Sequence, residues 1–358
     1  MSLFVTSLAI GPINTAGQAY QWCEAVRREL LIDAVSFAGT RRSTRRLDGR
    51  AHRRILHHAV RPKLIRRREV ESLLRGRTHV LSESLLPLLG DARSGALADE
   101  LPGLKRQGLT VGVVFHGSDV RDPARHMANL PYSFFRLGSE AWRAALGAAA
   151  RRRREAVEVM GIAAHVSTPD LLLDLPGATW IPLVVDPEVW ATVRPALETR
   201  TPVVLHVPSQ RTPAIKGTSF IDPVLQDLDR QGRVHYWSPA SIRHGDMPTL
   251  VGRADIVVEQ ILAGSYGVTA VEAMAAGRLV IGNVGPRTRA IMSEDPPIVD
   301  ATPETLEAVM DRVLERRDEF AALAANGPDY VRRVHGGELA ARALTPFLSS
   351  SEWSRARG

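Results

Sequence analysis

The 358-residue chain contains a single cysteine, only 5% aromatic residues and no long apolar run. The lone thiol, Cys23, excludes an internal disulfide and a cysteine-rich zinc site. No apolar run reaches the roughly 18–20 residues that a membrane-spanning helix requires. The N-terminus also lacks the positive region of a secretory signal. We therefore expect a cytoplasmic globular protein, and its length predicts two domains.

Positive charge gathers in one stretch of the chain. The formal net charge is +7, but residues 41–77 alone hold fourteen Arg and Lys against three Asp and Glu. A solvated surface, a face for anionic membrane lipid and a face for an anionic acceptor all fit this stretch, and lipid binding would make the protein peripherally membrane-associated. Nucleic acid is disfavoured, because no aromatic-interleaved or zinc-finger pattern accompanies the charge.

Strand and helix patterns alternate along the chain, which predicts an α/β protein with parallel sheets. Prolines at 187, 195 and 202 indicate a linker near residues 185–201. The expected strands are 3–10, 34–37, 79–82, 111–116, 163–167, 203–207, 233–237, 256–259 and 279–282. The expected helices are 18–30, 52–74 with an interruption near Pro62, 141–160, 218–229, 247–252, 303–316 and 337–348.

The most informative segment runs from Gly264 to Gly277 and reads GSYGVTAVEAMAAG. Its small residues open a short helix, and its last glycine stops that helix before a strand. The free N–H groups and the dipole of a helix start bind anions such as phosphate. Glu272, one and a half turns further along, can accept hydrogen bonds from sugar hydroxyls. Paired with Arg211 and Lys216, about fifty residues upstream, this segment predicts a nucleotide-sugar site.

Two cations stand in the loop after strand 203–207, within the sequence RTPAIKGT. Open α/β sheets bind ligands at the carboxyl ends of their strands. Arg211 as a planar fork and Lys216 as a point charge can grip a diphosphate and neutralise a leaving nucleotide diphosphate. Trp237 and Ser238, at the end of another strand, either flank the nucleobase or place the tryptophan in the core.

The motifs of the second half resemble the donor-binding domain of retaining GT-B glycosyltransferases of the family-four type, the glycosyl transferases of group 1. The Arg-x4-Lys-Gly-Thr, Gly-x-Tyr-Gly and Glu-Ala-Met-Ala-x-Gly segments follow the family's order. Looser matches are the loop 11–17, FHGSD at 115–119, STPD at 167–170 and IPLVVD at 181–186. The resemblance implies two doubly wound Rossmann-like domains facing a cleft, 1–186 and 187–337. It also implies that a C-terminal helix, about residues 338–358, crosses back onto the first domain.

The resemblance also implies roles for individual residues. Arg211 and Lys216 would hold the donor diphosphate, and Glu272 the nucleotide ribose. His116 would lie across the cleft near the anomeric carbon, although a histidine in such a loop is also found as a packed or turn-capping residue. The remaining expected contacts with the donor or its cleft are Gly17, Gly264, Ser265, Tyr266, Gly267 and Val268.

One feature departs from the family pattern, which has two glutamates separated by seven residues, the first contacting the donor sugar. Counting back from Glu272 places Gly264 where that first glutamate would stand, and Glu259 and Gln260 lie just upstream. The diphosphate and ribose contacts are unaffected, while the sugar, the nucleobase and the acceptor, whether a glycan, a lipid or a small molecule, stay open.

The sequence therefore predicts a sugar transferase that uses a nucleotide-sugar donor and keeps the anomeric configuration. We expect it to need no metal and no other cofactor, because the cations and the helix start would stabilise the departing diphosphate. A nucleotide-sugar epimerase on the same fold and a non-catalytic relative that binds nucleotide or membrane are the alternatives.

Overall fold

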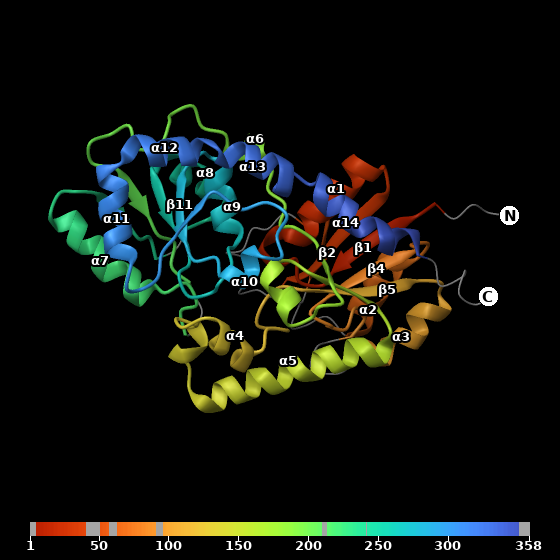
Figure 1. The fold of residues 1–358 in the computed structure, drawn as a ribbon. Helices are drawn as coiled ribbons and strands as arrows, with labels where there is room; N and C mark the ends of the chain where they lie inside the picture. The colour runs from red at the N-terminus through yellow and green to blue at the C-terminus, as the bar shows by residue number, and fades with distance from the viewer. Residues whose placement is uncertain are drawn as a thin grey trace.

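The computed structural model describes residues 5–40, 51–56, 63–90, 96–209, 213–240 and 242–350. These residues form two parallel sheets, each covered by helices on both faces (Figure 1). The predicted class, α/β with two Rossmann-like domains, is confirmed. Within the described ranges, no helix is both long and apolar enough to cross a membrane. Residues 41–50 and 57–62 of the basic stretch 41–77 lie outside the described residues, and the contact of this stretch with anionic lipid stays a prediction.

The first sheet has seven strands in the order β3-β2-β1-β4-β5-β6-β7. Alternate residues of β1 face opposite sides: Leu8 and Ile10 belong to one buried cluster, and Ala9 to the other. The strand order reverses between β1 and β4, so the loops that follow these two strands flank a crevice suited to ligands. The strands are β1 Ser7–Gly11, β2 Asp33–Thr40, β3 Arg53–Leu56, β4 His79–Glu83, β5 Thr110–Phe115, β6 Ala163–Val166 and β7 Thr179–Trp180.

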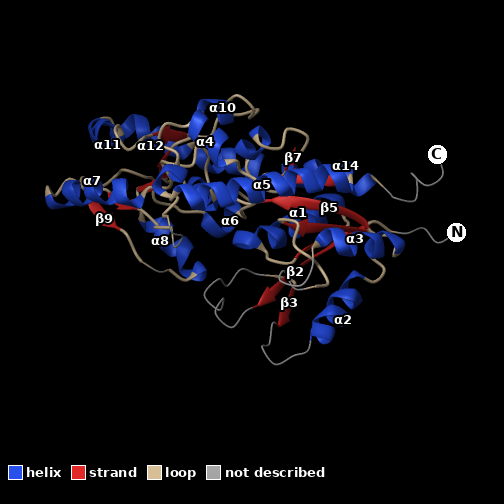
Figure 2. Cartoon of the chain, turned by 90° about the horizontal axis from the view of Figure 1, so that it is seen from below, coloured by secondary structure: helices blue, strands red, loops and turns tan. Residues whose placement is uncertain are grey.

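Helices connect these strands and cover the sheet. The first of them, α1, spans the residues predicted for it, Gln18–Leu30. Figure 2 shows α2 and β3 together at one edge of this domain. The other helices are α2 Lys63–Leu74, α3 Leu97–Arg106, α4 Pro123–Asn129 and α5 Glu140–Met160, with short 3-10 turns η1 Thr15–Gly17, η3 Phe134–Leu137 and η4 Pro169–Leu173.

The second sheet has five strands in the order β12-β11-β10-β8-β9. Its order reverses between β8 and β10, so the loops after these two strands meet at a second switch point. The strands are β8 Val203–Leu205, β9 His235–Trp237, β10 Ile256–Val258, β11 Leu279–Gly282 and β12 Ile298–Asp300. The helices are α6 Pro187–Trp190, α7 Thr218–Arg230, α8 Met247–Arg253, α9 Val268–Ala275, α10 Pro286–Arg289, α11 Leu306–Glu315, α12 Arg317–Ala325 and α13 Gly327–Tyr330, with the 3-10 turn η5 His244–Asp246.

The C-terminal helix crosses back to the first domain, as expected. After α13 the chain makes a π-helical turn, η6 Val331–His335, and continues as α14 Glu338–Ser349 (Figure 1). The apolar face of α14, with Leu344 and Phe347, is buried with Trp22 of α1 and Ile10 of β1. Burial of this face holds the end of the chain on the domain in which it began.

A second connection joins the domains between β5 and α5. Phe134 and Phe135, in η3, are buried in the core of the second domain rather than the first. The Phe134 N–H donates to the carbonyl of Leu262, in the loop after β10 (3.2 Å). The helix α4 before them is thereby held against the second domain.

Part of the expected secondary structure was wrong. Residues 53–56, expected as helix, form β3, which pairs in parallel with β2 from Phe37–Arg53 to Thr40–Leu56. The pairing with β2 outweighs the helix preference of the arginines, and α2 begins only at Lys63. The short elements α3, α4, α12, β7 and β12 were not expected, because none carries a long periodic pattern.

Candidate functional site

The loops after β8 and β10 meet at the switch point of the second sheet. The Ile261 N–H donates to the carbonyl of Lys216 (3.1 Å). Gly217, next to that lysine, has a φ of +88°, and a Cβ on it would lie 2.8 Å from Ile261 Cγ1. A residue with a side chain would push the two loops apart. The structure thus brings together the Lys-Gly-Thr motif and the segment that leads to Gly264.

His206, which directly follows β8, positions the start of α7 beside this junction. Its Nδ1 lies 2.8 Å from the carbonyl of Val258, and its Nε2 lies 2.9 Å from Thr218 Oγ1. Because Nδ1 donates to a carbonyl, Nε2 accepts from the threonine hydroxyl. Burial, reinforced by the charge of Lys216, lowers the pKa of His206 to about 4, so the ring is neutral at pH 7. No sequence signal marked this residue.

Glu259 links the predicted phosphate-binding groups to each other. Its Oε1 lies 3.2 Å from Lys216 Nζ, and its side chain is only 3% exposed. Its Oε2 accepts a hydrogen bond from the N–H of Gly267, the residue that precedes α9 (3.2 Å). One buried carboxylate therefore contacts both the lysine and the helix start.

Glu272 lies in α9 and is buried beside this pair. Its carboxyl group makes no hydrogen bond or ion pair with any residue in the described part of the chain. Burial raises its pKa to about 8, which the positive charge of Lys216 opposes and the negative charge of Glu259 reinforces. A carboxyl group near this cation has unused capacity to accept or donate hydrogen bonds.

The loop before α9 turns its tyrosine inward. The Tyr266 hydroxyl lies 3.0 Å from that of Tyr330 and 3.1 Å from His335 Nε2. Gln260 donates to the carbonyl of Ser265 (2.7 Å) and fixes the loop from inside. The Tyr266 side chain thus supports the loop, while residues 267–269 are half-buried and present the helix start. The predicted backbone contact of Ser265, Gly267 and Val268 with a donor stays a prediction.

Gly264 is in direct contact with a side chain of the first domain. Its φ is +65°, and a Cβ built on it would overlap Leu130 Cδ1, at the end of α4. A Cβ on Gly285 would also lie 3.0 Å from Leu130 Cδ2. Leu130 thus fills the space in which a side chain at residue 264 would begin. The sequence alone does not mark Leu130, because it lies 134 residues away in a segment of ordinary composition.

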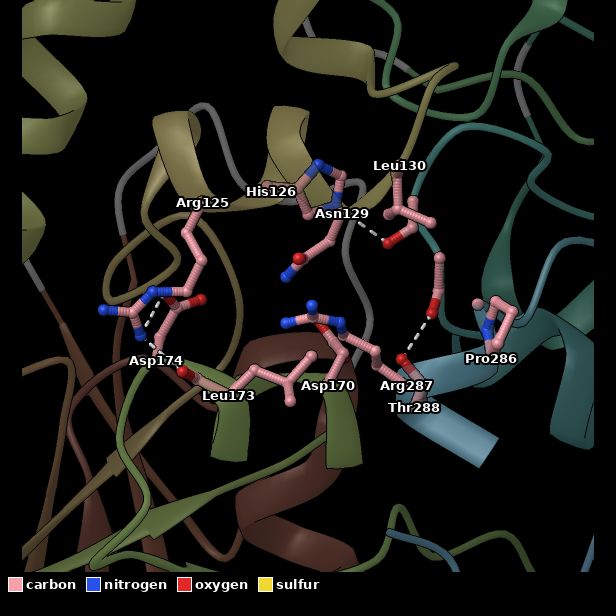
Figure 3. Close-up of a pocket in the computed structure, with 13 residues that line it drawn as sticks. Arg125, His126, Asn129, Leu130, Asp170, Leu173, Asp174, Pro286, Arg287 and Thr288 are labelled. Carbon is pink, nitrogen blue, oxygen red and sulfur yellow. Dashed lines mark hydrogen bonds and ion pairs between the residues drawn. The ribbon is translucent and has the colours of Figure 1, made fainter. Parts of the chain in front are cut away.

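A cavity lies between the domains next to this contact (Figure 3). Arg125 and Asn129 of α4 line it from the first domain, and Arg287 of α10 lines it from the second. Its wall is braced by His126, whose Nε2 lies 3.0 Å from the Ala263 carbonyl. Burial lowers the pKa of His126 to about 4, so this brace is uncharged at neutral pH.

A buried ion pair connects the loop that begins at His116 with η4, and Ser265 of the loop before α9 lies beside it. Arg121 donates to Asp170 Oδ2 from Nε (2.9 Å) and from its terminal nitrogen (2.5 Å). Burial acts to raise the pKa of Asp170, but Arg121 and the nearby hydroxyls of Thr168 and Ser265 hold it below its usual value. Neither hydroxyl is aligned for a hydrogen bond with Asp170 Oδ1, which accepts no hydrogen bond from any described residue. Ser265 therefore lies at the domain interface.

In the first domain, Glu83 organises the loop at the switch point. Its buried carboxylate accepts the N–H groups of Ile13 (2.7 Å), Asn14 (2.6 Å) and Thr15 (2.9 Å). Burial acts to raise the pKa of Glu83, yet His116 and these amides hold it below its usual value. The loop ends at Gly17, which precedes α1 with a φ of +75°.

His116 is held between two residues of the first domain. Its Nε2 lies 3.2 Å from Glu83 Oε1, and its ring stacks on Trp22 with centroids 5.7 Å apart. The approach to Glu83 is not aligned for a hydrogen bond, so the contact is electrostatic. The structure shows His116 as a packed residue, which is one of the two alternatives given for it. The position of His116 near an anomeric carbon stays a prediction. Glu83 was not expected.

Three other predicted residues stay untested. Arg211 lies outside the described residues. Trp237 is half-buried against the second core, and the Arg253 guanidinium lies 5.2 Å from its ring centroid. Ser238 Oγ lies 3.5 Å from Asp222 Oδ1, which is a weak contact. The nucleobase role of Trp237 and Ser238 stays a prediction beside the packing alternative.

No protein-family model and no curated protein sequence matches the chain. Solved structures do: the Anabaena protein HepE in complex with UDP and glucose has a TM-score of 0.60 at 12% identity, over 96% of this chain and 99% of its own. A glycosyltransferase from Rickettsia africae ESF-5 has a TM-score of 0.58 at 14% identity, over 96% and 97%. Sucrose-phosphate synthase from Thermosynechococcus elongatus has a TM-score of 0.55 at 14% identity, over 96% and 98%. The fold of this chain is GT-B, as predicted.

Proposed function

We propose that the protein is a glycosyltransferase that takes a sugar from a nucleotide diphosphate donor, bound at the switch point of the second sheet. The observation that carries this proposal is the convergence of Lys216, the start of α9 and Glu272 on one buried site. A cation and a helix start suit a diphosphate, and an unpaired carboxyl group suits the ribose hydroxyls. A GT-B neighbour, HepE, has UDP-glucose bound in another of its structures, which supports the same class of donor.

In this proposal the charge that develops on the departing diphosphate is stabilised by Lys216, Arg211 and the amides at the start of α9. The acceptor hydroxyl enters from the first domain, past Gly17 and His116. Its proton passes to the leaving phosphate oxygen, and the anomeric configuration is retained. The domains close over the donor and exclude water. Retention, family-four membership and independence from metal belong to the proposal.

A second candidate is a nucleotide-sugar epimerase. A putative UDP-N-acetylglucosamine 2-epimerase from Listeria monocytogenes shares the fold, with a TM-score of 0.50 at 12% identity over 96% of both chains. An epimerase changes its donor without an acceptor, whereas a transferase requires one. Incubation with the donor alone, followed by analysis of the sugar, therefore separates the two activities.

The proposed function is tested by thermal unfolding in the presence of UDP, GDP, ADP and their common sugar conjugates. A ligand that binds only the folded state raises the midpoint of unfolding, and the rise grows with the logarithm of the ratio of its concentration to its Kd. One nucleotide diphosphate should raise the midpoint of the wild type, and Glu272→Ala should reduce that rise. Glu307→Ala, an exposed position on α11, is the control and should leave it unchanged. A wild type that responds to no nucleotide would contradict the proposal and favour a non-catalytic protein.

A further inference from the structure

We propose that Glu259 is an internal counter-anion that occupies the place of the donor diphosphate, and that the donor must displace it from Lys216 and Gly267. This inference rests on the proposed function and assigns a residue that controls access to its site.

The contacts of Glu259 are those that a phosphate would make. One carboxylate oxygen lies 3.2 Å from the lysine ammonium, and the other accepts the N–H of Gly267, also at 3.2 Å. The carboxylate lies so close to the helix start that a Cβ on Gly267 would be 3.2 Å from Glu259 Oε1. A carboxylate therefore already sits between the two groups that define the anion site.

The contact between Glu259 and Lys216 has a physical reason. Lys216 is only 15% exposed, and a cation with so little water requires a partner. Its other acidic neighbour, Glu272, makes no ion pair with any described residue, which leaves Glu259 to neutralise the lysine. Glu259 thus keeps the site folded and electrically balanced before a donor arrives.

The same contact opposes the donor. A carboxylate and a diphosphate cannot both hold one ammonium and one N–H, and their like charges repel strongly in a buried site. An anion must therefore bind Lys216 and Gly267 more strongly than Glu259 does. A diphosphate, with two charged groups, meets that condition better than a single inorganic phosphate, so the contact favours nucleoside diphosphates over small anions.

The test is calorimetric titration of the full chain with pyrophosphate and with UDP. Glu259→Gln keeps the shape of the side chain and removes its charge, so pyrophosphate should bind at least about tenfold more tightly than to the wild type. Glu259→Asp keeps the charge and should show no such gain. Glu307→Gln removes one exposed negative charge from the same domain and is the control for net charge.

The outcomes distinguish this inference from the function on which it rests. If UDP binds the wild type and Glu259→Gln binds pyrophosphate equally or more weakly, Glu259 only positions Lys216 and the inference is overturned. If neither ligand binds either protein, the proposed function falls, and the inference with it. A crystal structure of the wild type with UDP tests the point without a substitution: Glu259 should have left Lys216, and a retained contact of about 3 Å would contradict the displacement.

Discussion

Leu130 of the first domain lies directly over Gly264 of the second, so that any Cβ on the glycine would overlap the leucine side chain. The contact occurs at the residue where the family pattern has its first glutamate. It joins the domains beside the proposed donor site and explains in steric terms why a side chain is absent there. A donor sugar must be recognised without a carboxylate at residue 264.

Gly264→Ala should lower the free energy of unfolding by roughly 2–4 kcal/mol, because it combines overpacking against Leu130 with a left-handed backbone. Denaturant unfolding measures this loss. Gly232→Ala is the matched control, since Gly232 has a φ of +69° and open space around its Cβ position. It should lose only the backbone component, about 1 kcal/mol. Leu130→Ala should recover part of the Gly264→Ala loss, and purely additive effects of the two changes would contradict the contact.

Glu272 makes stability depend on pH in the alkaline direction. Its pKa is raised to about 8, so the folded protein keeps a proton that the unfolded chain loses above its ordinary pKa near 4.5. The free energy of unfolding therefore falls as the pH rises from about 4.5 to about 8. Glu272→Gln should be more stable than the wild type at pH 9 by roughly 2–4 kcal/mol, with little difference at pH 4. Equal stability of the two proteins at pH 9 would show that Glu272 is not desolvated.

Buried histidines impose the opposite dependence at acid pH. His126, His165, His206 and His335 have pKa values lowered to about 4, chiefly by burial. Between this value and the ordinary pKa of 6.5, the unfolded chain binds protons that the folded protein does not, so stability falls as the pH falls. The free energy of unfolding should drop by roughly 1–4 kcal/mol between pH 6.5 and pH 5.

One substitution tests this acid dependence. His165 is buried beside the Val113 carbonyl. The substitution His165→Asn should lower the free energy of unfolding at pH 8. It should also make the dependence of that free energy on pH at acid pH shallower, by up to one proton. Urea titrations at a series of pH values give both quantities. A slope that is the same in His165→Asn and the wild type would assign the acid sensitivity to other groups.

The crossing helix α14 contributes stability to the first domain. Leu344 is fully buried against α1 and β1, and its replacement by Ala should cost roughly 2–5 kcal/mol. Arg342, on the same helix, is 70% exposed and forms only a surface ion pair with Glu338, so Arg342→Ala should cost less than about 1 kcal/mol. Similar losses in the two variants would mean that α14 does not pack as the structure shows.

The sequence predicted those parts of the fold that local patterns determine. The bounds of α1 and β11 were predicted to the residue. Gly17 and Gly277 lie just before these elements, in turns with a positive φ that favours glycine. The helix predicted at the residues of the edge strand β3 was wrong. The arginines of β3 carry no strand pattern, and only the pairing with β2 makes this segment extended. Short elements that depend on burial against neighbours were missed for the same reason.

The candidate site divides along a similar line. The motifs around Lys216 and Glu272 were visible in the sequence, because each is contiguous and follows a strand. Glu83 was not visible, because its partners are backbone amides 68 to 70 residues upstream, which no spacing reveals. Glu259 was noted as a nearby carboxylate, but its contacts with Lys216 and Gly267 follow only from the meeting of two loops.

The most direct test of the donor site is a calorimetric titration of the wild type, Glu272→Ala and Lys216→Ala with the nucleotide diphosphate that stabilises the protein most. The wild type should bind with one site per chain. Both variants should bind at least about tenfold more weakly, since each loses a charged or hydrogen-bonding contact to the ligand. Unchanged affinity in both variants would contradict a donor site built from Lys216, the start of α9 and Glu272.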